Sequence, residues 1–263
     1  SAGVTVSIHG TLTAAGTLTN AGSSTGNGIT LAAGSELYNG AGGRITNLSG
    51  KAVIATGGGT VVDAGTLIGG SGAVSFASGF ANRMVLQAGA AITGTVDGGN
   101  SIGSSIASTL EAAGGVFFGN LGTQFIDFAQ ITIDPGAYWQ LTGSNALSAG
   151  TTLTNNGGEL SSGGGLIVLA TLTNSGSIAG RGVYLASGAV LDNLAGGRIT
   201  NQQGGDAVNA SAGAATVFNA TMSAVAGSSH SLDKRHVPCQ PIRHHSPQWI
   251  RAGAAGRNQD VRL

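Results

Sequence analysis

The sequence predicts an all-β protein, a β-solenoid whose short strands stack coil upon coil. Three observations support this fold class. Short alternating apolar runs recur about every eight residues, glycine supplies 48 of the 263 residues, and a long stretch of the chain returns almost unchanged 154 residues later. Alternation indicates strands, glycine indicates turns, and self-similarity indicates coils that bury their apolar edges against one another.

The expected strands are short and lie too close together to leave room for crossover helices. Glycine, asparagine, serine and aspartate separate them, and these residues tolerate the backbone conformations of tight turns. In chain order the clearest strands are expected at residues 4–8 (VTVSI), 29–31 (ITL), 44–47 (RITN), 52–55 (AVIA), 60–62 (TVV), 73–76 (AVSF) and 131–133 (ITI).

Nearly the same nine-residue phrase occurs at 39–47 (NGAGGRITN) and at 193–201 (NLAGGRITN). The match extends without a gap over 17–47 and 171–201, with 20 identities in 31 positions. Since a ligand-binding motif is normally needed once, a repeated phrase is typical of a structural turn. Coils of roughly 22 to 24 residues would make the 154-residue interval about seven coils long.

The period of two along a strand predicts which side chains face the interior of each coil. Three apolar residues of the first copy and their counterparts in the second are expected to point inward: Leu18, Ile45, Val53, Leu172, Ile199 and Val208. Their neighbours Thr17, Thr19, Arg44 and Thr46 are expected to point outward, and Asn20, Asn39 and Asn47 are expected at corners.

Composition divides the chain into two parts. Residues 1–228 carry the repeats and hold nine acidic and five basic residues, a net charge of −4. Residues 229–263 form a non-repeat tail with two acidic and six basic residues, a net charge of +4. Because the strand pattern is absent from the tail, disorder or an out-of-frame reading is expected there. Its possible metal ligands, His236, Cys239, His244 and His245, match no zinc spacing.

Several function classes lack support in the sequence. No basic stripe with interleaved aromatics indicates nucleic-acid binding, and no apolar run is long enough for a membrane span. Ser24 lies in a nucleophile-elbow pattern, but Ile178 replaces it in the second copy. Lys51 lacks the glycine frame of a phosphate loop, and Val74 stands where a calcium-binding nonapeptide needs aspartate. Neither a cofactor nor a metal is therefore expected.

The segment from Asp127 to Trp139 carries the alternative of a carbohydrate-active β-helix. Asp127 and Asp134 could lie close together or on adjacent coils, as glycoside hydrolysis requires of a carboxyl pair. Aromatic residues crowd the same part of the chain and could form a platform for a sugar or fill a wide part of the core: Phe117, Phe118, Phe125, Phe128, Tyr138 and Trp139. No long loop is expected to wall a cleft, so catalysis is not predicted.

The repeats at 17–47, 71–100 and 122–143 resemble the passenger regions of bacterial autotransporter and filamentous-haemagglutinin-like adhesins. The resemblance implies a right-handed parallel β-helix exported by type V secretion and displayed outside a Gram-negative cell. It supplies no catalytic motif to carry over. The expected partners are ligands on host cells, other bacteria or a matrix, and a translocating barrel is expected elsewhere in a longer protein.

The chain is therefore expected to be a passenger fragment that acts as a structural and adhesive surface stalk, not as an enzyme. The alternatives are a polysaccharide lyase or glycoside hydrolase that uses the Asp127 to Trp139 region, and a disordered glycine-rich chain.

Overall fold

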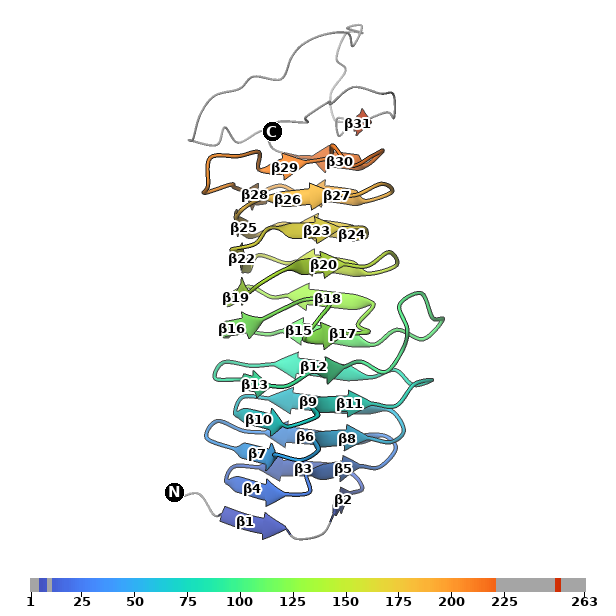
Figure 1. Cartoon of the computed structure of the whole chain (residues 1–263), viewed down its shortest axis with the longest axis vertical. Coiled ribbons are helices and arrows are strands. Elements are labelled where there is room, and N and C mark those ends of the chain that lie inside the picture. The colour runs from blue at the N-terminus through green and yellow to red at the C-terminus, as the bar shows by residue number, and fades with distance from the viewer. Residues whose placement is uncertain (1–4, 9–10, 221–248, 252–263) are drawn as a thin grey trace, which may run out of the picture.

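The computed structural model describes residues 5–8, 11–220 and 249–251. The described residues form strands and turns without helices, and none could span a membrane as a helix. The strands stack into a column whose long axis follows the chain from β1 to β30 (Figure 1). The expected β-solenoid is confirmed, and the expectation of a disordered chain is wrong for residues 11–220.

Sheet C runs the whole length of the column as successive parallel strands and ends on one antiparallel partner. Its strands are β3 (Thr17–Asn20), β6 (Ser35–Asn39), β9 (Gly59–Asp63), β12 (Arg83–Leu86), β15 (Thr109–Ala112), β18 (Gln130–Ile133), β21 (Thr152–Asn155), β24 (Thr171–Asn174), β27 (Val190–Asn193), β30 (Thr216–Asn219) and β31 (Trp249–Arg251).

Two further faces close each coil, and each face is divided into two sheets along the column. On the first face, sheet A contains β1 (Thr5–Ile8), β4 (Ser23–Gly26), β7 (Arg44–Asn47), β10 (Thr66–Gly69) and β13 (Ala91–Thr93). Sheet D continues that face with β16 (Gly115–Gly119), β19 (Ala137–Leu141), β22 (Glu159–Ser162), β25 (Ser177–Gly180) and β28 (Arg198–Ile199).

The second face is divided in the same way, one coil further along. Sheet B contains β2 (Leu12–Ala14), β5 (Ile29–Leu31), β8 (Lys51–Ala55), β11 (Gly72–Phe76), β14 (Val96–Asp97) and β17 (Phe125–Ile126). Sheet E contains β20 (Asn145–Leu147), β23 (Leu166–Val168), β26 (Val183–Leu185) and β29 (Val208–Asn209). Strands β1 to β30 thus form ten triplets, which we number as coils one to ten.

The long repeat fits the coil count. Thr17 and Thr171 begin β3 and β24, which lie seven strands apart in the order of sheet C, so the 154-residue interval spans seven coils. Individual coils vary in length: Thr17 pairs with Glu36, 19 residues on, whereas Arg83 pairs with Thr109, 26 residues on. Variable corner turns account for this spread because the paired strands keep their register.

The predicted facing of side chains is confirmed at most positions. Five of the six residues predicted to point inward are buried: Ile45, Val53, Leu172, Ile199 and Val208. The sixth, Leu18 in coil one, is half-buried. Thr17, Thr19 and Arg44 are exposed, as expected of outward side chains. Thr46 is an exception, since it is buried although its position faces outward. The Arg44 side chain folds back over it, with Nε donating to Thr46 Oγ1 over 3.1 Å.

The predicted corner residues form ladders along the column. In the lower part, Asn20 Nδ2 donates to Asn39 Oδ1 and Asn39 Nδ2 donates to Asp63 Oδ1, each over 2.7 Å. In the upper part, an equivalent ladder of side-chain amides joins Asn155, Asn174, Asn193 and Asn219 over 2.7 to 2.9 Å. Asn47 instead caps its own turn, since its Oδ1 accepts from the backbone nitrogen of Gly50. These bonds satisfy polar groups that the buried corners would otherwise leave without water.

The sequence predicts a boundary between residues 1–228 and 229–263. Most of the second part lies outside the described residues, including His236, Cys239, His244 and His245. Only the strand β31 represents it.

Candidate functional site

The middle of the column contains a break in two of its three faces. Sheet A ends at β13 and sheet D begins at β16, while sheet B ends at β17 and sheet E begins at β20. Sheet C crosses this zone without interruption. Because the Asp127 to Trp139 region lies here, the break is where the sequence-based site candidates must be judged.

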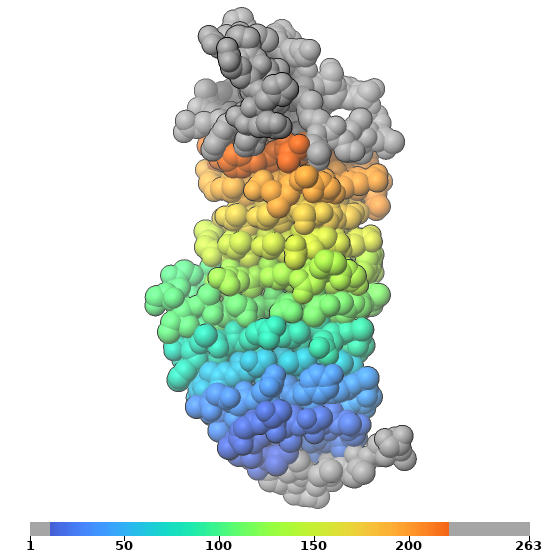
Figure 2. Space-filling view, turned by 180° about the vertical axis from the view of Figure 1, so that it is seen from behind, coloured from blue at the N-terminus to red at the C-terminus, as the bar shows by residue number. Residues whose placement is uncertain are grey.

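A connection of eleven residues, 98–108, links β14 to β15 beside the break. The expectation that no long loop inserts between strands is therefore wrong. Figure 2 shows this loop as a bulge on the flank of the column. Its base is fixed by buried polar side chains, since Asn100 Nδ2 donates to Ser108 Oγ over 2.9 Å and Ser108 Oγ donates to the Gly98 carbonyl.

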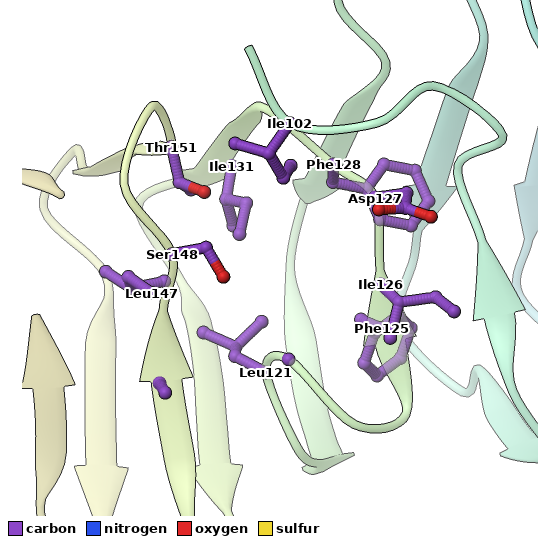
Figure 3. A pocket seen from close by; sticks show the side chains of 12 residues that line it. Ile102, Leu121, Phe125, Ile126, Asp127, Phe128, Ile131, Leu147, Ser148 and Thr151 are labelled. Carbon is purple, nitrogen blue, oxygen red and sulfur yellow. The ribbon is translucent and has the colours of Figure 1, made fainter. Parts of the chain in front are cut away.

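The loop covers a small pocket that opens between β17 and β20 (Figure 3). Ile102 reaches it from the loop, and Asp127 lies at one side with Ser148 and Thr151 at the other. The remaining wall is mostly apolar, and the cavity volume is about 100 Å³. Ligand pockets usually measure about 300 to 1,000 Å³, so this one has room for a few waters or a small group, not for a sugar chain.

Asp127 is the unusual residue of the pocket. Its φ of 60° is the single positive value found for a non-glycine residue in the described part of the chain. Burial raises the pKa of its carboxyl group, and the charge of Asp97 raises it further. Asp97 lies one coil below, paired in register with Ile126. A positive φ at a non-glycine residue and a carboxyl of raised pKa occur at functional sites and at structural corners alike.

Asp134 belongs to a different cluster. It follows β18, whereas Asp127 precedes that strand, so the two carboxyls lie at opposite ends of it. Burial raises the pKa of Asp134, and so do the charge and side-chain hydrogen bond of Glu111, while Arg83 opposes the shift. Arg83 Nη2 in turn contacts Glu111 Oε2 at 2.6 Å. The structure therefore pairs Asp127 with Asp97 and Asp134 with Glu111, and it does not bring Asp127 and Asp134 together.

The aromatic residues near the break fill the core. Phe117, Phe125, Phe128 and Trp139 are all buried, and Trp139 is fully inaccessible. Phe125 and Phe117 meet Trp139 edge to face, with ring centroids 5.2 and 6.5 Å away. Such packing widens the coil and stabilises it. Since Trp139 is enclosed, it cannot stack on a sugar; Phe118 is exposed, but on the opposite side of β16 from this cluster.

The motif fragments have structural explanations. Ser24 is buried inside β4, paired with Ile45, and so does not occupy a strand-to-helix elbow. Lys51 Nζ donates to Ser75 Oγ over 2.8 Å on the outer face of sheet B. Val74 is part of the core. Within the described ranges, no group of three or more histidine, cysteine or carboxylate residues could hold a metal ion.

Two partners at this site escaped the sequence analysis. Asp97 and Glu111 face Asp127 and Asp134 because coils stack in register, and that register depends on the irregular lengths of the corner turns.

Comparison with protein-family models, curated proteins and solved structures finds no match to this chain.

Proposed function

We propose that this chain is a structural and adhesive stalk, part of a secreted autotransporter-type passenger that presents contact surfaces outside a Gram-negative cell. The observation that supports the proposal is the ten-coil column with one continuous face. Sheet C extends parallel from β3 to β30, and a continuous apolar core follows it. Such a body has the form of a spacer with long lateral faces, and each coil is supported by its neighbours.

The properties of the pocket at the break favour a stalk over an enzyme. A cavity of about 100 Å³ under the 98–108 loop offers no groove for a polymer, and Trp139 is enclosed. One observation favours the alternative, a polysaccharide lyase or glycoside hydrolase. It is the raised pKa of the Asp127 carboxyl. Burial and the neighbouring charge of Asp97 at a structural corner account for that shift equally well.

Attachment of coated beads tests the proposal. Beads carrying the wild-type chain should bind epithelial cells, bacteria or a collagen matrix more strongly than beads carrying Ile45→Asp, which places a charge in the core. Fused to a translocating barrel, the chain should become accessible to protease on the surface of a Gram-negative host. No attachment above the Ile45→Asp background on any of the three surfaces would refute the adhesive role.

Reducing-sugar release separates the stalk from the enzyme. A panel of polysaccharides is incubated with the wild type, Asp127→Asn and Asp134→Ala. We expect no release by any of the three. Release by the wild type that either substitution abolishes would replace the stalk with a carbohydrate-active enzyme.

A further inference from the structure

A groove lies on the corner between sheets B and C, in coils two to four. It has a volume of about 490 Å³, within the range of ligand sites, and it is open to solvent along one side. Three stacked corner turns form it, at residues 32–34, 56–58 and 77–82. The groove is separate from the pocket at the break and from Asp127.

The floor of the groove is made of glycine. A Cβ atom on Gly58 would lie 3.1 Å from Phe80 Cβ and 3.4 Å from its ring, and one on Gly57 would lie 3.0 Å from Ala33 Cβ. The Gly34 nitrogen donates to the carbonyls of Gly57 and Gly58, which ties neighbouring turns together. The Phe80 side chain therefore lies over bare backbone, yet it remains 43% exposed. A large aromatic residue on a rigid turn offers one face to a ligand.

A row of polar side chains runs beside Phe80. Glu36, Thr60 and Arg83 occupy register-paired positions on the outer face of sheet C. Neighbouring strands are about 4.8 Å apart, so the row presents a carboxylate, a hydroxyl and a guanidinium over about 10 Å. The Glu36 side chain makes no hydrogen bond or ion pair within the described part of the chain. Arg83 bonds Glu111 through Nη2, which leaves its other N–H groups for a ligand.

A second aromatic surface lies beyond the row. Tyr38 is two residues after Glu36 on β6, and its hydroxyl lies 3.3 Å from Gln87 Oε1, two coils further along. Val62 pairs in register with Tyr38, and Val85 pairs with Val62, so both valines lie on the outer face of sheet C, yet both are buried. Tyr38 is itself 39% exposed. Gly58 lies next to Phe80, and Val62 pairs with Tyr38. These two positions are four residues apart, which corresponds to about 13 Å along extended backbone.

The geometry points to a neutral oligosaccharide as the ligand of this groove. We propose that Phe80 stacks on the C–H face of one sugar ring, that Tyr38 contacts a neighbouring ring, and that Glu36, Thr60 and Arg83 bond the hydroxyl edge between them. A sugar matches this surface because it offers an apolar face and a rim of donors and acceptors. A polyanion does not, because Glu36 and Glu111 flank the one cation, Arg83.

The biological role of this site rests on the proposed adhesive function. A neutral oligosaccharide would be the class of ligand that the stalk contacts. Its binding can be measured without cells, so the two proposals fail separately.

The probes are cellotetraose, mannotetraose and chitotetraose, with tetragalacturonate as the acidic comparison. Binding to the full chain is followed by amide chemical shifts, and the Gly57 and Gly58 signals report contact at the groove floor. We expect at least one neutral tetrasaccharide to bind and to move those two signals. Phe80→Ala should weaken the Kd at least about tenfold, since it removes a stacked ring. Glu36→Gln keeps the shape of the surface and should weaken the binding of the tetrasaccharide several-fold.

Phe118→Ala is the matched control, because Phe118 is an exposed phenylalanine on sheet D, away from the groove. It should bind like the wild type. The proposal is overturned if no neutral tetrasaccharide binds, if tetragalacturonate alone binds, or if Phe80→Ala and Glu36→Gln bind as tightly as Phe118→Ala. Bead attachment that persists while the tetrasaccharides fail to bind would remove this site and leave the stalk proposal in place.

Discussion

Replacing Asp63 with asparagine should stabilise the protein at neutral pH. Asp63 is fully buried at the upper end of the lower ladder, where its Oδ1 accepts from Asn39 Nδ2 and from the Gly65 nitrogen. Its Oδ2 has no hydrogen-bond partner among the residues that the structure describes. Burial raises the pKa of its carboxyl from 3.8 to about 6, against the lowering effect of the bonds from Asn39 and Gly65. The folded protein therefore holds this proton more tightly than the unfolded chain does.

The sign and size of the effect follow from that difference. Because the folded state binds the extra proton between pH 3.8 and about 6, stability falls as pH rises through this window and stays lower above it. A shift of about 2 pKa units corresponds to about 3 kcal/mol. Asparagine carries no charge, so Asp63→Asn should exceed the wild type by up to about 3 kcal/mol at pH 7.5 and lose this advantage near pH 3.5.

Asparagine also fits the ladder geometrically. Asn39 Nδ2 lies 3.4 Å from the carbonyl of Thr66, which is the first residue of β10 in sheet A. Ala91 pairs with Thr66 in register, so its carbonyl occupies the equivalent position for residue 63. An amide at residue 63 can donate to that carbonyl, whereas the ionised Oδ2 of Asp63 cannot.

Urea unfolding followed by circular dichroism at several pH values measures the effect. The wild type and Asp63→Asn are compared at each pH, so that other titrating groups cancel from the difference. Asp192→Asn, on the outer face of β27, controls for removal of a charge. The reasoning is refuted if Asp63→Asn is the less stable protein at pH 7.5, or if its difference from the wild type does not change between pH 3.5 and 7.5.

Three further comparisons test the packing of the coils, each by the same unfolding assay. Ile45→Asp or Ile199→Asp should lower the free energy of unfolding by more than about 3 kcal/mol, because each buries an unpaired charge. Arg44→Ala should change it by less than about 0.5 kcal/mol. Equal losses would contradict the predicted facing of β7. Gly197→Ala should cost about 1 to 3 kcal/mol, because its Cβ would lie 2.4 Å from Asn193 Oδ1 and the Asn174 carbonyl, while Gly163→Ala, in open space, should be neutral. Trp139→Ala should cost about 3 to 5 kcal/mol as a cavity opens against Phe125, and a loss below about 1 kcal/mol would show that the aromatic layer is not a tight core.

The fold was accessible from the sequence because its signals are local or repetitive. Alternation places Ile45 and Ile199 inside each coil, and the long repeat gives the coil count without any knowledge of pairing. The exchange of asparagine for aspartate at residue 63 was also readable, since the second copy has Asn219 at that place. The 98–108 loop left a signal too, in eleven residues without regular alternation.

The surfaces were not accessible in the same way. Phe80 meets Gly57 and Gly58 because a six-residue corner stacks above a three-residue one, and Tyr38 reaches Gln87 across two coils. These contacts depend on how corner turns of unequal length stack. Sequence spacing alone does not determine that stacking, so the approach of Asp97 to Asp127 and of Glu111 to Asp134 was not predicted.

The two copies of the long repeat lie on opposite sides of the break in the column, over β3 to β7 and over β24 to β28. The corner position that carries asparagine in both ladders is occupied by Leu86, Ala112 and Ile133 in the coils between them. These three corner residues are buried and apolar, and no copy of the phrase appears in their coils.

At the break the ladders of sheets A and B end, and the exposed edge of sheet A is bonded in another way. Gln124 Nε2 lies 3.3 and 3.4 Å from the carbonyls of Ile92 and Gly94, at the end of sheet A. A side chain thus replaces the missing strand at an edge that could otherwise pair with another chain. Continuity of the column through this zone depends on sheet C, on the β14–β17 and β16–β19 pairs and on the aromatic layer, so each step between coils keeps two of its three faces.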